Sequence, residues 1–328
     1  MGKVIIGIHG LGNKPKADLL EEWWWKSIDE GLQKYTDNKF RKPKFKLVYW
    51  ADVLHKNPED ENILNSDNPL FLEEKYIPEI VEHKNTEHPL RKKIIDTILS
   101  QLNNVFLNDD YSLNFSGLND LIIKNYFSDL EAYYNSQTND KNQLIRNVLH
   151  NRLKTILIQH KRDDVLLIAH SMGSIVAYDV LTLFAKQLKI KTLITIGSPL
   201  GVPFVISKIA KELHLNNRET QRPEIPFSIQ KSWFNFSDLE DKVAFNYHLK
   251  DEFLVNEKGV KITDFIVSND YTINGNHNPH KSYGYLRTPE LSEKVYAFLT
   301  EKRKSFYQQL FEFIQNIFKV ANNGGKQK

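Results

Sequence analysis

Residues 165–173 read Val-Leu-Leu-Ile-Ala-His-Ser-Met-Gly, and they are the clearest indication of the fold in this sequence. Its apolar run, Val165 to Ala169, is typical of a strand covered on both faces of a parallel sheet. A helical pattern begins near Gly173. A serine at such a strand-to-helix turn projects its hydroxyl from the end of the strand, and its neighbours are small because the turn is strained. We therefore predict that Ser171 is a nucleophile rather than only the N-cap of the following helix.

The rest of the chain alternates strand and helix patterns. The predicted strands are residues 4–8, 45–50, 165–169, 193–196, 232–236 and 264–267. The predicted helices are residues 16–35, 143–159, 173–187, 204–213 and 289–302. Because parallel strands need such crossovers, this alternation is typical of a doubly wound α/β fold. We expect a mostly parallel sheet flanked by helices.

Residues 55–142 interrupt this alternation, since they are polar and contain helix-like patches at 91–107 and 118–134. A plain loop of this length is uncommon. We expect a largely helical insertion or cap, set between the two parts of the core at 1–54 and 143–303.

The C-terminal residues 304–328 begin with an apolar stripe at helical spacing, flanked by basic residues. We expect an amphipathic helix followed by a disordered tail from residue 322. Docking of this helix on the core is the simpler interpretation. The alternative is peripheral contact with a membrane surface.

Composition excludes several classes of protein. The chain has 328 residues and no cysteine, which excludes disulfides, thiolate zinc sites and cysteine nucleophiles. Its net charge of +3 is too small for the basic face of a nucleic-acid-binding protein, so we expect no nucleic acid partner. No apolar run reaches the ~18 residues of a membrane span, and the N-terminal run is too short for a signal peptide. We expect a cytoplasmic protein.

A second motif, His9-Gly10-Leu11-Gly12, follows the first predicted strand. A His-Gly turn allows backbone amides to approach a substrate oxygen, so the amides of Leu11 and Met172 are candidates for an oxyanion hole. An ordinary glycine-containing loop is the simpler alternative. An anion-binding turn is another, but the chain has neither G-x-G-x-x-G nor G-x-x-x-x-G-K-[ST].

A carboxylate that orients a histidine is expected in the loop after the strand 232–236. This loop contains Asp238, Glu240 and Asp241. We favour Asp241, because an apolar residue follows two positions later. Asp238 is the alternative.

The general base is expected between the last strand and the last helix, where His277 and His280 occur. We favour His280, which lies nearer the helix and next to Ser282-Tyr283, and His277 is the alternative. The two histidines also form a His-x-x-His pair, but no carboxylate or cysteine partner completes a metal site. We expect no metal and no cofactor.

Together these motifs resemble the α/β-hydrolase superfamily, and more narrowly its lipase and esterase-like members. The resemblance covers about two thirds of the chain and follows the superfamily's order of serine, aspartate and histidine. It implies the α/β-hydrolase fold, with Ser171 as nucleophile, His280 as base and Asp241 as the residue that orients it. Two departures are the long insertion and a sheet that begins with the oxyanion-loop strand.

The resemblance implies a serine esterase that acts on a lipid or another acyl ester through an acyl-enzyme. A thioesterase, amidase or acyltransferase would use the same three residues. A noncatalytic scaffold that keeps the fold and recruits a partner through residues 55–142 is the alternative from a different class.

Overall fold

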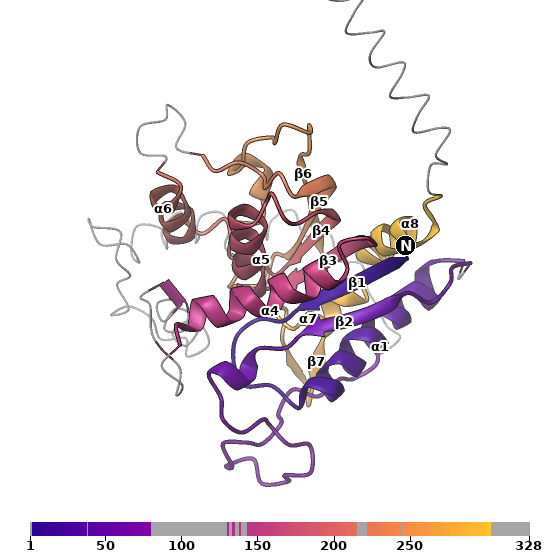
Figure 1. Ribbon diagram of the computed structural model, residues 1–328. Helices are drawn as coiled ribbons and strands as arrows, with labels where there is room; N and C mark the ends of the chain where they lie inside the picture. The colour runs from indigo at the N-terminus through magenta and orange to yellow at the C-terminus, as the bar shows by residue number, and fades with distance from the viewer. Residues whose placement is uncertain are drawn as a thin grey trace, which may run out of the picture.

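The computed structural model describes residues 2–37, 39–79, 130, 133–134, 138, 143–214, 222–244 and 246–302. Within these ranges, six parallel strands form one sheet in the order β2-β1-β3-β4-β5-β6 (Figure 1). They are β1 (Lys3–Ile8), β2 (Lys44–Val48), β3 (Asp164–His170), β4 (Ile190–Ile196), β5 (Ile229–Asp238) and β6 (Ile262–Val267). All six predicted strands are present, although β2 ends at Val48 rather than at Trp50.

Helices cover both faces of the sheet (Figure 1). One face carries α1 (Ala17–Tyr35), α7 (Ser282–Leu286) and α8 (Pro289–Thr300), and the other carries α4 (Ile145–Gln159), α5 (Met172–Leu183) and α6 (Pro203–Glu212). Successive strand residues point to opposite faces. Accordingly, Ile6 packs with α4 and α5, while its neighbour Ile5 packs with α1 and α8. The predicted α/β fold with flanking helices is confirmed.

Shorter elements complete the described part of the chain. Two 3-10 helices, η1 (Ala51–Val53) and η3 (Leu249–Asp251), follow β2 and β5. An antiparallel hairpin joins β7 (Thr272–Ile273) to β8 (Asn276–His277) between β6 and α7. In the described ranges, no helix has both the length and the apolarity that a membrane span requires.

The winding of the sheet reverses between β1 and β3. From β1 the chain passes through α1 to β2 on one side, and then returns to β3 on the other side of β1. Right-handed crossovers therefore place α1 and α4 on opposite faces. Open α/β sheets bind ligands at the carboxyl ends of the strands where the winding reverses. The register pairs Ile8 with Ala169, so the His-Gly loop and Ser171 emerge together at this point.

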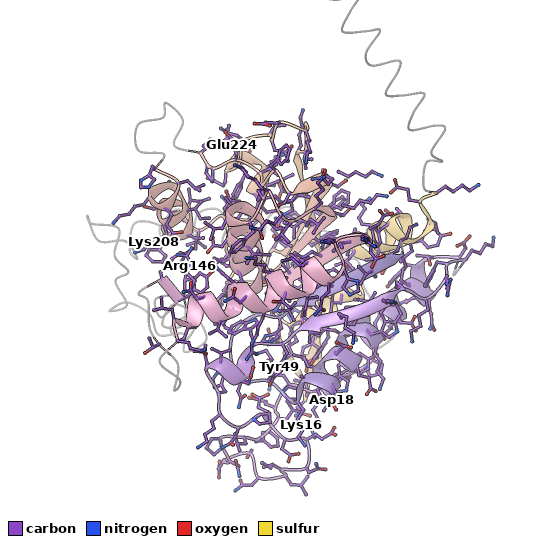
Figure 2. The ribbon with its side chains drawn as sticks, in the orientation of Figure 1. Lys16, Asp18, Tyr49, Arg146, Lys208 and Glu224 are labelled. Atoms are coloured by element: carbon purple, nitrogen blue, oxygen red, sulfur yellow. The ribbon has the colours of Figure 1, made fainter. Side chains whose placement is uncertain are left out.

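A polar cluster holds α5, the helix that follows Ser171. Arg146 of α4, labelled in Figure 2, donates to Asp179 of α5 at 2.7 Å and to both carboxylate oxygens of Glu212 of α6 at 2.6 Å. The buried hydroxyl of Tyr133 donates to the same Asp179 at 2.7 Å and lies 2.6 Å from Nε2 of His150. Bidentate Arg–carboxylate pairs fix geometry as well as charge, so the one guanidinium of Arg146 links α4 to both α5 and α6.

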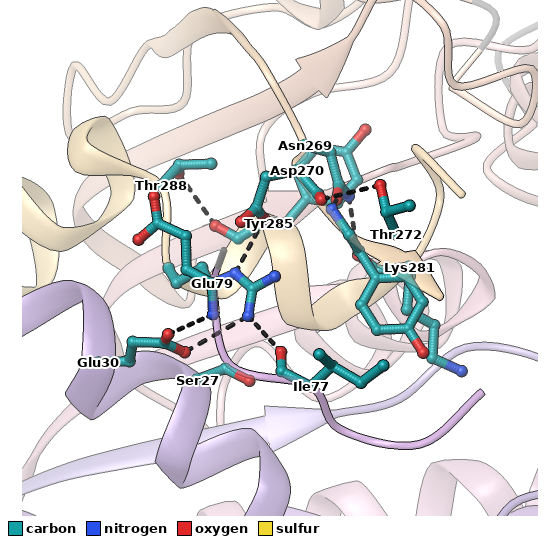
Figure 3. Close-up of polar contacts among 12 residues, drawn as sticks. Ser27, Glu30, Ile77, Glu79, Asn269, Asp270, Thr272, Lys281, Tyr285 and Thr288 are labelled. Atoms are coloured by element: carbon teal, nitrogen blue, oxygen red, sulfur yellow. Dashed lines mark hydrogen bonds and ion pairs between the residues drawn. The ribbon is translucent and has the colours of Figure 1, made fainter. Parts of the chain in front are cut away.

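The described part of the predicted insertion is attached to the core by Arg287. The buried guanidinium donates to Asp270 at 2.8 Å and to the Ile77 carbonyl at 2.6 Å, with Glu30 at 3.4 Å (Figure 3). The other oxygen of Glu30 accepts from the Glu79 amide at 2.6 Å. A buried charge needs such partners, and these partners join α1, the loop after β6 and residues 77–79.

Some of the predicted helices cannot be compared with the structure. The helix-like patch at 91–107, most of the patch at 118–134, and the C-terminal helix and tail at 304–328 lie outside the described residues.

Candidate active site

Ser171 occupies a sharp turn between β3 and α5. Its backbone has φ 53° and ψ −131°, a conformation that costs energy for a residue with a side chain. The Ser171 amide donates to the Ile196 carbonyl at 3.1 Å, and Ser174 donates to the Ser171 carbonyl through its amide at 2.9 Å and its hydroxyl at 2.6 Å. These contacts hold the strained strand-to-helix turn that the motif predicts.

Two glycines allow the backbone of β1 to approach this turn. A Cβ atom on Gly10 would lie 2.6 Å from the Cβ of Ser171. A Cβ on Gly173 would lie 2.7 Å from the carbonyl oxygens of Ile8 and His9. Real Cβ atoms do not approach other atoms this closely. The contact between the His-Gly loop and the Ser171 turn therefore requires glycine on both sides.

The structure brings Ser171, His280 and Asp241 together in one hydrogen-bonded chain. Nε2 of His280 lies 3.0 Å from Oγ of Ser171, and Nδ1 lies 2.9 Å from both carboxylate oxygens of Asp241. Because a carboxylate only accepts, Nδ1 carries a proton, and in the neutral ring Nε2 then accepts from the serine hydroxyl. Such an imidazole can take the serine proton while the carboxylate stabilises the charge that forms.

The two candidate acids have different partners. The Asp241 side chain is fully buried, and its Oδ1 also accepts from the Val243 amide at 2.9 Å. Asp238 instead accepts from the Glu240 amide at 2.7 Å and from the Asn269 amide at 2.6 Å. Asp238 thus joins its own turn to the loop after β6, and Asp241 is the carboxylate that reaches His280.

The two candidate bases, His277 and His280, also have different partners. Nε2 of His277, on β8, lies 2.7 Å from the Asn269 carbonyl oxygen, and its Nδ1 lies 3.3 Å from Glu240. Since His277 and His280 have different partners, they do not form the His-x-x-His pair considered from the sequence. Among the described residues, no group of three or more His, Asp or Glu side chains is arranged to hold a metal ion.

His9 holds the loop after β1 in place. It is buried and stacks on the Trp50 ring, with centroids 4.8 Å apart and ring planes 10° from parallel. Its Nε2 accepts from the Trp50 amide at 2.9 Å, so the proton is on Nδ1, which donates to the Gly10 carbonyl at 2.7 Å. Burial, reinforced by the charge of Lys14, lowers the pKa of His9 to about 3. The ring is therefore neutral near pH 7.

This bond also orients the candidate oxyanion hole. The Gly10 carbonyl and the Leu11 N–H belong to one planar trans peptide and point in opposite directions. By holding that carbonyl, His9 sets the direction of the Leu11 amide. Met172 is the first residue of α5, so its amide is among those that a helix leaves unpaired within itself.

His170 was not singled out from the sequence, yet it contacts His280, the favoured candidate base. Its Nε2 donates to the His280 carbonyl at 2.7 Å, and the two ring centroids are 4.8 Å apart. Burial, followed by the charge of His280, holds the pKa of His170 well below its usual value. The position before the serine has no fixed residue type in this kind of motif, so the sequence contained no signal for the role of His170.

The comparison with protein families gives a match over residues 95–283, more than half of the chain, to a model described as PGAP1-like alpha/beta domain. The chain belongs to this family. The PGAP1-like family is α/β-hydrolase-like. The match includes Ser171, Asp241 and His280, whereas the loop with His9 and Leu11 lies before it.

Other comparisons add little to this PGAP1-like assignment. No curated protein matches the chain. One similar solved structure is the 2.75 Å crystal structure of an uncharacterized protein from Bacillus cereus ATCC 10987, at 12% identity and a TM-score of 0.32. The alignment covers 92% of this chain and 60% of that chain, so this chain spans about three fifths of that protein.

Proposed function

We propose that this PGAP1-like chain is a serine hydrolase that cleaves carboxylic esters, with Ser171 as nucleophile, His280 as base and Asp241 as the residue that orients the base. Membership of an α/β-hydrolase-like family supports a hydrolase-type function. The observation that carries the proposal is the continuous chain from Ser171 Oγ to His280 at 3.0 Å and on to Asp241 at 2.9 Å. A scaffold would have no need for a buried serine held at positive φ opposite an imidazole.

In the proposed reaction, the Ser171 hydroxyl attacks the acyl carbonyl and His280 takes its proton. The resulting oxyanion lies against the amides of Leu11 and Met172. The intermediate collapses to an acyl-enzyme as His280 returns the proton to the departing alcohol. Water then attacks the acyl-enzyme with His280 again as base, which releases the acid and restores the serine.

Lipid or other acyl esters are the proposed substrates, supported by the likeness of the motifs to those of lipases and esterases. Thioesters, amides and acyl transfer would use the same groups. A substrate panel that pairs each ester with its thioester and amide of equal acyl length separates these chemistries, because only the scissile bond differs.

The test is covalent labelling with a fluorophosphonate probe, followed by hydrolysis of p-nitrophenyl esters of graded chain length. We expect wild type to be labelled, and Ser171→Ala and His280→Ala to lose labelling and turnover. Ser228→Ala is the matched control: this buried serine donates to the Leu181 carbonyl at 2.8 Å, at the opposite end of β5 from Asp238.

Labelling that persists in Ser171→Ala would place the nucleophile elsewhere. A folded wild-type protein that neither labels nor hydrolyses any member of the panel would support the noncatalytic scaffold instead.

A further inference from the structure

We propose that Tyr285 is a positioning residue of this site: its hydroxyl holds the Asp241 carboxylate and thereby sets the pH at which the Ser171–His280 pair becomes active. The inference rests on the proposed function. Neither the sequence motifs nor the family match points to this tyrosine.

The hydrogen bonds of Tyr285 have defined directions. The residue lies on α7 and is buried. Its hydroxyl oxygen is 2.8 Å from the Asp238 amide and 2.8 Å from Oδ2 of Asp241. An amide N–H only donates, so the oxygen accepts there, and its single proton goes to Asp241. Tyr285 therefore joins the end of β5 to the carboxylate that faces His280.

The Tyr285 hydroxyl keeps its proton over the pH range of an activity assay. Burial raises the pKa of the Tyr285 hydroxyl well above its usual value, and the charges of Asp241 and Asp238 raise it further. The hydroxyl therefore stays protonated at every pH used in such an assay. Tyr285 acts on the site as a constant hydrogen-bond donor.

The hydroxyl competes with the imidazole for one carboxylate oxygen. Oδ2 of Asp241 receives both Nδ1 of His280 at 2.9 Å and the Tyr285 hydroxyl at 2.8 Å. A hydrogen bond to a charged acceptor is strong, and it draws on the negative charge that would otherwise stabilise a protonated imidazole. Without the hydroxyl, Asp241 would hold the imidazolium more tightly and would be less firmly located.

Other charged and titratable groups face the pair from several elements. His170 at the end of β3 contacts His280, and Asp238 of β5 lies beside Tyr285. The charges of Lys14 and Lys281 act on the adjacent His170. All four remain in place when only the Tyr285 hydroxyl is removed, so a change in pH dependence on that removal reports the hydroxyl.

The test compares Tyr285→Phe with wild type in the pH profile of kcat/KM on a p-nitrophenyl ester. We expect the acid limb to move to higher pH by about 0.5 to 1 unit, and kcat at its plateau to fall ~10-fold with KM nearly unchanged. Tyr283→Phe is the control. This buried tyrosine of the same helix packs against Trp23, Tyr76 and Tyr271, and we expect an unmoved profile.

Replacement of Tyr285 by site-specifically incorporated 3-fluorotyrosine keeps the shape and makes the hydroxyl a stronger donor, so it provides a test even if Tyr285→Phe does not fold. We expect the acid limb to move to lower pH, opposite to the shift in Tyr285→Phe. An unmoved acid limb in either variant, with fluorophosphonate labelling intact, would overturn the role of Tyr285 alone. A wild-type protein that does not label would instead overturn the proposed function.

Discussion

The two halves of the candidate site are held together by different means. Around Ser171 the chain packs without side chains between the segments, because Gly10 lets the loop after β1 touch Ser171 and Gly173 lets the start of α5 touch the carbonyl oxygens of Ile8 and His9. Around His280 and Asp241, side chains make the contacts: His170 bonds to the His280 carbonyl and Tyr285 to the Asp241 carboxylate. The half around Ser171 leaves no room for a larger residue at Gly10 or Gly173. The half around His280 depends on particular hydrogen-bond donors and charges.

Glu74 illustrates the second half. It accepts from Lys281 at 2.6 Å and from the amide of Asn278, and the other end of the Asn278 side chain accepts from the His280 amide at 3.0 Å. The neighbouring Lys75 carbonyl accepts from the Tyr271 hydroxyl at 2.7 Å. Residues 74–75 of the predicted insertion therefore form hydrogen bonds with residues before and after His280 in the loop that carries it.

The largest expected effect is on the backbone-packed half. Gly10→Ala places a methyl group against Ser171 and displaces the His-Gly loop, so we expect the rate of fluorophosphonate labelling to fall on the order of 100- to 1000-fold. Gly2→Ala is the control, because its Cβ would lie at an ordinary 3.6 Å from Asp163. If a folded Gly10→Ala protein labels within a few-fold of wild type, the backbone contact does not position Ser171.

A second expected effect concerns His9, in the same half of the site, and the way that the stability of the protein depends on pH. The pKa of His9 is lowered to about 3, so the unfolded chain takes up a proton below about pH 6.5 that the folded chain refuses. The unfolding free energy should therefore fall with falling pH, by ~1.4 kcal/mol per unit from this residue, or ~2 kcal/mol between pH 6 and 4.5.

Urea unfolding of His9→Gln at several pH values measures this contribution. We expect a shallower pH dependence than in wild type, whatever the stability of the variant at neutral pH. Equal slopes in the two proteins would show that His9 takes up protons similarly in the folded and unfolded states.

The smallest expected effect lies in the half held by side chains. Glu74→Gln keeps the shape but removes the charge that faces Lys281, and partly exposed ion pairs contribute ~0.3–1 kcal/mol. We expect kcat/KM to fall ~2- to 5-fold at low salt, with the gap closing at high salt. Glu73→Gln, at the exposed neighbouring position, is the control. A loss that persists unchanged at high salt would count against an ion-pair role.

The difference between the half around Ser171 and the half around His280 explains what could be predicted from the sequence. The six strands and five longer helices follow from local periodicity, and Ser171 was recognisable because a strand, a turn and a helix are contiguous around it. β2 ends at Val48 rather than at Trp50. The Trp50 amide donates to His9 instead of continuing the sheet, and no local pattern reports such a contact.

The contacts around His280 could not be predicted in the same way. Spacing favoured Asp241 over Asp238 and His280 over His277, and the structure places the favoured pair together. The contributions of Tyr285 and of the other side chains that hold this loop depend on contacts between distant segments. The hairpin and α7 were missed because two to five residues are too few to show a period.

The backbone of Ser171 has a consequence for how this protein responds to stabilisation. A side chain at φ 53° costs on the order of 1–3 kcal/mol, a large share of the stability of a typical domain. Glycine would adopt the same turn without that cost, but it would remove the hydroxyl. Selection for thermal resistance alone would thus favour loss of the serine, so stability and the proposed activity are in conflict at residue 171.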